Sequence, residues 1–437
     1  MGRYVSRHWH PRFDAPVKRE RRGGRYEAFV PDVLSGWSPR VSVGLVATLG
    51  EAEAALAAWN RSYTADVPHP LDAFAYVLLR VEATASSRIE AIELSPRRLL
   101  TAEAEHREGG RSSDRRAVEV LANIEAMEDA VRLASVGRSL STDDLLDVHR
   151  RLMAASMHPG LGGWVRDVQN WIGGSGYTPV GATFVPPPPE EVPALLEDLM
   201  AFVNRPDVPP LVQAGIAHAQ FETIHPFGDG NGRVGRALIH AVLRRRGVAP
   251  VFVPPVSAVL ARSPNVYFEG LTTWRHVGAA DDPGRDRAAE EWLGVFAEAT
   301  HSACQEAHSY LQAVSALETD LRHRAAPVRR GSSADLLLGM LPACPIFTVP
   351  SAAGIIGRSA VATGSAVNHL AEAGVLRQRT VGKERYRVFE APDVIRLISQ
   401  LDRELSLQSP PARDTTSPLD DRNRTQHYPS PGLDIGL

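Results

Sequence analysis

Apolar residues recur at helical spacing through most of this sequence, and that periodicity limits the chain to a mainly α-helical fold. Ser141, with Asp143 and Asp144 in the turn that follows, is a typical helix start. The pattern is interrupted between 158 and 192, where Gly, Thr, Val and Pro crowd together, and this stretch predicts one short β-hairpin. The expected helical segments are 43–60, 71–93, 117–134, 142–155, 193–204, 211–224, 233–246 and 287–317.

A second unit follows the Arg- and Ser-rich break RHRAAPVRRGSS. Its pattern predicts helices at 334–341, 351–356 and 360–372, with a turn at Gly357. Two strands are then expected around Gly382 and Lys383 in LRQRTVGKERYRVF. This order predicts a C-terminal winged helix-turn-helix domain.

Composition excludes several classes of protein. A net charge of -3 argues against a chain that binds polyanions over its whole surface. Cys304 and Cys344 stand apart from any CxxC or Cys/His cluster, so neither a disulfide framework nor a zinc site is expected. There is no signal-like apolar run at the start and no stretch of 18 apolar residues later, which predicts a cytoplasmic protein without a membrane segment.

Twelve residues, HPFGDGNGRVGR at 225–236, gather unusual chemistry between two apolar helices. The segment Gly230 to Gly232 can turn consecutive backbone N–H groups toward one point, and a helix starting near Arg233 adds its positive N-terminal dipole. Arg233 and Arg236 are three residues apart on that helix and can fork around a polyphosphate. We therefore expect a phosphate cradle, although a lone Gly/Asn loop would more simply be a turn.

Two further residues of this segment suit catalysis. The Asp229 carboxylate can hold Mg²⁺ together with phosphate oxygens, and so neutralise charge on a leaving pyrophosphate. His225, as a neutral imidazole, can take the proton from a hydroxyl that attacks a phosphorus atom. The pattern predicts base catalysis without a covalent intermediate.

HPFGDGNGRVGR resembles the signature of the Fic family, HxFx(D/E)GNGRxxR, at every specified position. The resemblance implies that His225 is the base, Phe227 a core anchor, Asp229 the metal ligand, and Arg233 and Arg236 the residues that hold the triphosphate of ATP. The nucleotide-binding set that it implies is Phe227, Gly228, Asp229, Gly230, Asn231, Gly232, Arg233, Arg236, Tyr267 and Phe268.

Other segments resemble the same family, namely GGWVRDVQNWIGG at 162–174, ATFVPPPPEEV at 182–192 and NVYFEGL at 265–271. The family has a hairpin flap that pairs with an extended target segment, and Tyr177 to Phe184 would be that flap here. Tyr267 and Phe268 resemble an aromatic pair that lines the adenine pocket. From the residues alone, both would be interpreted as core.

Ser86 and Glu90 in TASSRIEAIE are four residues apart, so they share one face of the predicted helix. They resemble the Fic inhibitory motif (S/T)xxxE(G/N), whose Glu pairs with the second signature arginine, here Arg236. A carboxylate there would compete with the γ-phosphate of ATP for this arginine. Ala91 departs from the motif, which usually has Gly or Asn at that position.

The residue patterns and the resemblance together predict five regions. They are an N-terminal arm at 1–40, an N-terminal helical region at 41–110 with the inhibitory helix at about 82–93, a Fic catalytic core at 111–325, the winged helix at 333–404 and a disordered tail at 405–437, where Ser, Pro, Asp and Arg replace large apolar residues.

The implied function is that of a protein adenylyltransferase, which moves AMP from ATP to a Ser, Thr or Tyr hydroxyl of a target protein or of itself and is held off by Glu90. Removal of AMP, or transfer of another phosphate-containing group on the same scaffold, stays open. A nucleotide-sensing regulator that binds DNA through the winged helix is a further alternative, and a homodimer is plausible. The residues that would face DNA are Arg358, Asn368, His369, Arg377, Arg379, Lys383, Arg385 and Arg387.

Overall fold

The computed structural model describes residues 2–11, 18, 20–65, 71–110, 112–250, 254–278, 282–379 and 387–407. The expected tail, from residue 408 onward, lies outside the described residues. The same holds for the turn at Gly382 and Lys383 and for Arg385.

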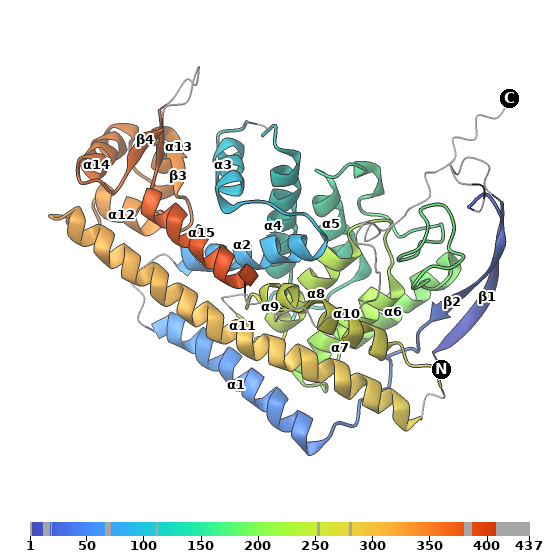
Figure 1. Cartoon of the computed structure of the whole chain (residues 1–437). Coiled ribbons are helices and arrows are strands. Elements are labelled where there is room, and N and C mark those ends of the chain that lie inside the picture. The colour runs from blue at the N-terminus through green and yellow to red at the C-terminus, as the bar shows by residue number, and fades with distance from the viewer. Residues whose placement is uncertain are drawn as a thin grey trace.

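Helices dominate the described residues, which confirms the mainly α prediction (Figure 1). The predicted helical segments are confirmed, except that the one expected at 71–93 ends at Ile89, and α3, α9, α10 and α15 are helices that the pattern did not indicate. Through the first 325 residues the helices are α1 Val43–Ala65, α2 Leu71–Ile89, α3 Pro96–Arg107, α4 Arg115–Leu133, α5 Thr142–Met153, α6 Val192–Val203, α7 Pro210–Ile224, α8 Asn231–Arg245, α9 Val256–Arg262, α10 Pro264–Trp274 and α11 Pro283–Arg324, with short 3₁₀ turns at Pro159–Leu161 and Pro189–Glu191. No helix in the described part of the chain is both long and apolar enough to span a bilayer.

The centre of the molecule is the pair α7 and α8. Every residue of α7 from Leu211 to Ile224 is buried, so this helix is covered on all sides by its neighbours. Helix α8 packs against α7, α4 and α2, while the long helix α11 runs beside α1 along one edge (Figure 1). The loop that joins α7 to α8 is therefore held by a rigid core at both of its ends.

The N-terminal arm contains two strands that the sequence did not predict. Strands β1 Arg3–Trp9 and β2 Gly24–Val30 pair antiparallel. The Phe29 amide donates to the Val185 carbonyl at 2.9 Å, and Trp9 packs edge-on against Trp171. The arm thus lies over the middle of the chain, as expected of an arm, but as a two-stranded sheet.

The prediction of a β-hairpin between 158 and 192 is wrong, because the structure describes all of this range and has no two-stranded ladder in it. The described residues there form one isolated antiparallel bridge, Ile172 to Phe184, and the residues 177–183 that were expected to form the flap are bends and turns. Gly173, Gly174 and Gly181 have φ of +75°, +75° and +80°, a conformation that interrupts extended backbone.

The C-terminal unit packs on α3 and α11 (Figure 1). Its small antiparallel sheet has the order β3-β5-β4. Thr348 caps α13, which ends at Gly357 with φ of +63°. Its elements are α12 Ser333–Met340, β3 Ile346–Thr348, α13 Val349–Ile356, α14 Ala360–Glu372, β4 Arg377–Arg379, β5 Val388–Glu390 and α15 Pro392–Leu407.

Candidate active site

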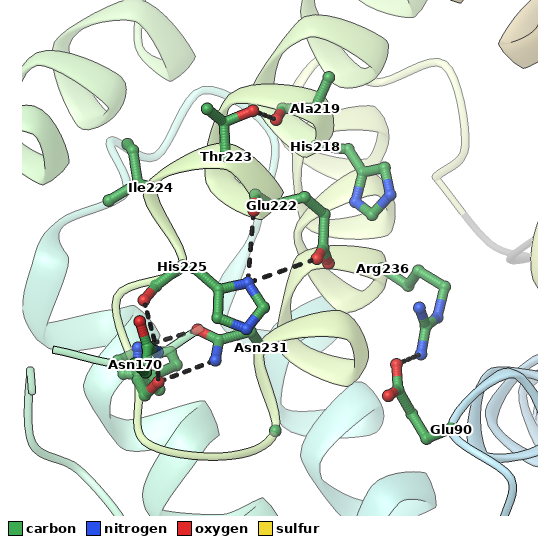
Figure 2. A network of polar contacts seen from close by, with 12 residues as sticks. Glu90, Asn170, His218, Ala219, Glu222, Thr223, Ile224, His225, Asn231 and Arg236 are labelled. Atoms are coloured by element: carbon green, nitrogen blue, oxygen red, sulfur yellow. Dashed lines mark hydrogen bonds and ion pairs between the residues drawn. The ribbon is translucent and has the colours of Figure 1, made fainter. Parts of the chain in front are cut away.

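The loop between α7 and α8 is fixed by its own backbone geometry. Helix α7 ends at His225, which has left-handed φ and ψ of 50° and 60°. Gly230, with φ of +77°, precedes α8, and a Cβ there would lie 2.9 Å from the Leu152 side chain. Asn231 closes the loop, since its side chain accepts from the Phe227 amide at 2.8 Å and donates to the Phe227 carbonyl at 2.9 Å (Figure 2). Asn231 therefore shapes the loop from inside.

Phe227 is fully buried, as its expected part of core anchor requires. Its ring stacks on His149 with centroids 3.8 Å apart. Burial lowers the pKa of His149 to about 4, so this imidazole is neutral. His149 also contacts the Asp229 carbonyl at 3.1 Å through Nε2. No sequence pattern indicated this support, because a single His on an amphipathic helix is usually interpreted as an ordinary core residue.

His225 is 2% exposed. Its Nδ1 lies 3.3 Å from the Glu222 carbonyl, so Nδ1 carries the hydrogen and donates it. Nε2 has no hydrogen-bond partner among the described residues. Burial, reinforced by the positive charge of Arg166, lowers the pKa of His225 to about 3. The imidazole is therefore neutral, with a free lone pair on Nε2 that can accept a proton.

Two residues that support His225 were missed by sequence reasoning. Arg166 is buried and donates to the His225 carbonyl at 2.8 Å and to the Pro187 carbonyl at 2.6 Å. Glu222 is buried one turn before His225, and its Oε2 lies 3.9 Å from His225 Nδ1. Arg166 lies in the segment 162–174, and the family resemblance of that segment was the one available signal for it. No sequence pattern indicated Glu222.

Asp229 and Arg233 lie next to each other where the loop meets α8. The Asp229 side chain is 40% exposed, and it lies 3.6 Å from the guanidinium of Arg233. The described residues contain no cluster of three or more His, Cys, Asp or Glu side chains that could hold a metal by themselves. A cation at Asp229 would thus need ligands from a substrate or from water.

Glu90 and Arg236 form an ion pair across the site (Figure 2). Helix α2 ends at Ile89, so Glu90 lies in the turn that follows rather than within the expected helix of 82–93. Arg236 is buried and donates to Glu90 Oε1 at 2.8 Å, to the Ser86 carbonyl at 2.9 Å and to Ser86 Oγ at 2.8 Å. Burial alone would raise the pKa of Glu90, but Arg236 outweighs burial and the pKa is lowered. The carboxylate is therefore charged.

The close approach of Glu90 to α8 explains why residue 232 is a glycine. A Cβ at Gly232 would lie 2.0 Å from Glu90 Oε1, so only glycine leaves room for this carboxylate against α8. Gly228 lies in the same buried loop. The Glu90 carboxylate thus lies where the phosphate cradle is predicted.

The aromatic pair divides into a core residue and a surface residue. Tyr267 is 1% exposed, contacts His218 Nε2 through its hydroxyl at 2.9 Å and packs against Trp292. Phe268 is 40% exposed, and its ring centroid is 5.1 Å from that of Tyr267. Tyr267 fits the interpretation as core, while Phe268 is accessible to a ligand.

Comparison with known proteins gives two family matches. Residues 139–243 match the family described as Fic/DOC family, and residues 46–132 match the family described as Fic/DOC family N-terminal. The first match spans α5 through most of α8, including the loop 225–230. The second match spans α2 with Ser86 and Glu90.

Individual relatives are similar over the same region. Protein adenylyltransferase fic-1 of Caenorhabditis elegans is 34% identical over 118 residues, which are 26% of this chain and 21% of that protein. Protein adenylyltransferase Fic of Nematostella vectensis is 31% identical over 124 residues, 28% of this chain and 27% of that protein. The chain therefore matches only about a quarter of the length of these relatives.

Among solved structures, a Fic family protein from Desulfovibrio desulfuricans G20 is 22% identical, with a TM-score of 0.49, and the match covers 81% of this chain and 98% of that one. The two family matches include both the loop that carries His225 and the turn that carries Glu90. The chain therefore carries a Fic/DOC domain at 139–243, preceded at 46–132 by the N-terminal region of that family.

Proposed function

We propose that this protein is an adenylyltransferase that transfers AMP from ATP to a Ser, Thr or Tyr hydroxyl of a protein, either a target or the chain itself. One observation carries the proposal: the unpartnered Nε2 of His225 lies in the loop that leads into the N-terminus of α8, which bears Arg233 and Arg236. The two Fic/DOC family matches and the names of the two relatives support it.

The reaction follows from these positions. His225 Nε2 takes the proton of the attacking hydroxyl, the hydroxyl oxygen forms a bond to the α-phosphorus, and the bond from that phosphorus to the bridging oxygen breaks. Pyrophosphate leaves with the electron pair of that bond. The amides of residues 231–233 begin α8 and have no partner within the helix, so they can bind phosphate oxygens together with Arg233.

Asp229 fits a divalent cation because its carboxylate is accessible and adjoins the phosphate cradle. Phosphate oxygens and water would complete the coordination of Mg²⁺. Bound there, Mg²⁺ would neutralise the charge that develops on pyrophosphate.

We propose that Glu90 inhibits this reaction. It occupies the guanidinium of Arg236, which would otherwise hold the γ-phosphate of ATP, so ATP binds weakly or with its α-phosphorus misaligned. The test is intact mass after incubation with ATP and Mg²⁺. The Glu90→Gly variant is expected to gain AMP, the wild type far less, and the double variant Glu90→Gly/His225→Ala none. Equal labelling with and without His225 would contradict the proposal, and loss of AMP from a modified protein would favour the reverse reaction.

The C-terminal unit is proposed to be a winged helix, on its helix order and its β3-β5-β4 sheet. Binding to DNA is less well supported, because several candidate contacts are engaged within the protein. Arg358 donates to the Gly331 carbonyl, His369 contacts the Ala325 carbonyl at 2.8 Å, and Arg377 pairs with the buried Glu390. A mobility shift with random duplex that weakens steeply with salt would favour DNA binding.

A further inference from the structure

Glu222 is the buried acid that lies nearest to the proposed base. It belongs to the last turn of α7, and its carboxylate points toward the His225 ring (Figure 2). Glu222 Oε2 lies 3.9 Å from His225 Nδ1, while Nε2, the other ring nitrogen, is the proposed proton acceptor. Contacts of this kind are often long in a free enzyme and shorten once substrate is bound.

The fold makes room for this carboxylate at one position. A Cβ at Gly235 would lie 2.7 Å from Glu222 Oε1 and 3.2 Å from His218 Nδ1. Oε1 is buried and has no hydrogen-bond partner in the part of the chain that the structure describes. A buried carboxylate oxygen without a partner costs stability. A role beyond packing would explain why the chain keeps a glutamate here.

Charges from several elements face Glu222. Arg236 comes from α8, Arg275 follows α10 and Glu90 follows α2, while His218 and His225 are its neighbours on and after α7. Burial raises the pKa of Glu222 to about 7, with Arg236 and Arg275 opposing the rise and Glu90 adding to it. The carboxyl group therefore changes its charge near neutral pH.

In the free protein His225 is a weak base. Burial lowers its pKa to about 3, so the imidazolium that forms during the reaction is strongly disfavoured. A carboxylate beside Nδ1 offsets that cost, because it stabilises a positive ring and holds the tautomer that leaves Nε2 free.

We propose that Glu222 is a positioning residue for His225, whose carboxylate orients the ring and stabilises the imidazolium formed when Nε2 takes the proton of the attacking hydroxyl. This role rests on the proposed function. The proton stays on His225 while the new oxygen–phosphorus bond forms and pyrophosphate departs, and it then passes to solvent. Glu222 remains ionised throughout, so protonation of its carboxyl group below about pH 7 slows the reaction.

The experiment uses the full chain with Glu90→Gly as the active parent, and compares Glu222→Gln, Glu222→Asp and Glu103→Gln in it. Glu103 is a buried carboxylate of α3 remote from the loop, so its variant controls for neutralising a buried acid. In the parent, burial still raises the pKa of Glu222 but Glu90 no longer adds to the rise, so kcat for AMP transfer is expected to fall as pH is lowered through a pKa that lies below the wild-type value. Glu222→Gln should lower kcat at pH 8 by about 10- to 100-fold, leave KM for ATP within about twofold and abolish this acid limb. Glu222→Asp should retain part of the rate and the limb.

A kcat and pH profile in Glu222→Gln equal to those of the parent would overturn the inference, as would losses no larger than those in Glu103→Gln. Histidine ¹⁵N NMR provides a readout that needs no AMP transfer. The His225 ring shifts should inflect as Glu222 titrates and lose that inflection in Glu222→Gln. Absence of the inflection in the parent also overturns the inference. Failure of the parent to transfer AMP, with the inflection present, counts against the proposed function alone.

Discussion

Ala91 is the residue at which this chain departs from the inhibitory motif that it resembles. Its φ is +60°, and within the described residues it shares positive φ with only one other non-glycine residue, His225. A left-handed conformation costs an L-residue roughly 1–2 kcal/mol relative to glycine. The usual Gly or Asn thus has a physical reason, because the chain must turn sharply just after α2 to aim Glu90 at Arg236.

Replacing Ala91 with glycine should relieve that strain. The gain is partly offset by the greater freedom of glycine in the unfolded chain, so Ala91→Gly is expected to raise the free energy of unfolding by up to about 1 kcal/mol. It should also reduce the residual AMP transfer of the wild type. Urea denaturation measures the first effect and intact-mass labelling the second.

The matched control is Ala54→Gly, at an exposed right-handed position inside α1, which should lose about 1 kcal/mol. Equal destabilisation by both substitutions would contradict the assignment of strain to Ala91.

The residues of the site that could be predicted from the sequence are those that stand together in it. His225 to Arg236 form one run whose spacing carries its own chemical meaning. His149, Arg166 and Glu222 come from α5, the segment before the polyproline and α7, and each is a single polar residue in an otherwise ordinary stretch. Only the packing of these elements brings the three side chains to the loop, and the one local signal was the family resemblance of the segment 162–174, which contains Arg166.

At the scale of elements, α2 is held in place by more than Glu90. Glu82 is fully buried and contacts His240 of α8 at 2.8 Å, and its carboxylate also accepts from the Ser257 amide at 2.7 Å. On another side of the helix, Arg88 forms an ion pair with Asp402 of α15 at 2.6 Å. Helix α15 therefore contacts α2 two residues before Glu90. This contact links the C-terminal unit to the residue that is proposed to inhibit AMP transfer.

Removing the contact between Arg88 and Asp402 should weaken the proposed inhibition while Glu90 itself is unchanged. A partly exposed ion pair contributes at most about 1 kcal/mol, so Asp402→Asn is expected to raise wild-type AMP transfer by up to about fivefold. Intact-mass labelling over time measures the rate. Asp393→Asn is the control, because Asp393 lies on the same helix but pairs with Arg324 of α11. A rise of the same size in both variants would contradict a specific link from α15 to α2.

Helices and sheets differed in how well the sequence predicted them. Helical periodicity identified α4, α5, α7 and α8 because each buries one face or all faces at a regular spacing. The strand pair β1 and β2 was missed because arginines interrupt its alternation, and its stability depends on contacts such as Trp9 with Trp171. The residues expected to form the flap were assigned to strands because Thr and Val favour them, but glycines with positive φ prevent a ladder.

At the scale of the whole molecule, the C-terminal unit and the N-terminal helices share a buried charge. Glu390 of β5 is 0% exposed and pairs both with Arg97 of α3 at 2.7 Å and with Arg377 of β4. The Arg97 side chain is 47% exposed and the Arg377 side chain 64%. The carboxylate therefore depends on its partners more than the partners depend on it, since water can solvate the guanidinium groups but not Glu390.

This asymmetry sets the order of the effects of mutation. The double variant Arg97→Ala/Arg377→Ala leaves an uncompensated buried carboxylate and should lower the free energy of unfolding by about 3–5 kcal/mol. Glu390→Gln keeps a polar group that the arginines can still contact, and should cost less, about 1–2 kcal/mol. Urea denaturation measures both, and the opposite order would contradict the argument. Because α15 follows β5 directly, undocking of the sheet from α3 should also displace Asp402 from Arg88, so the double variant is expected to transfer AMP at least as fast as Asp402→Asn.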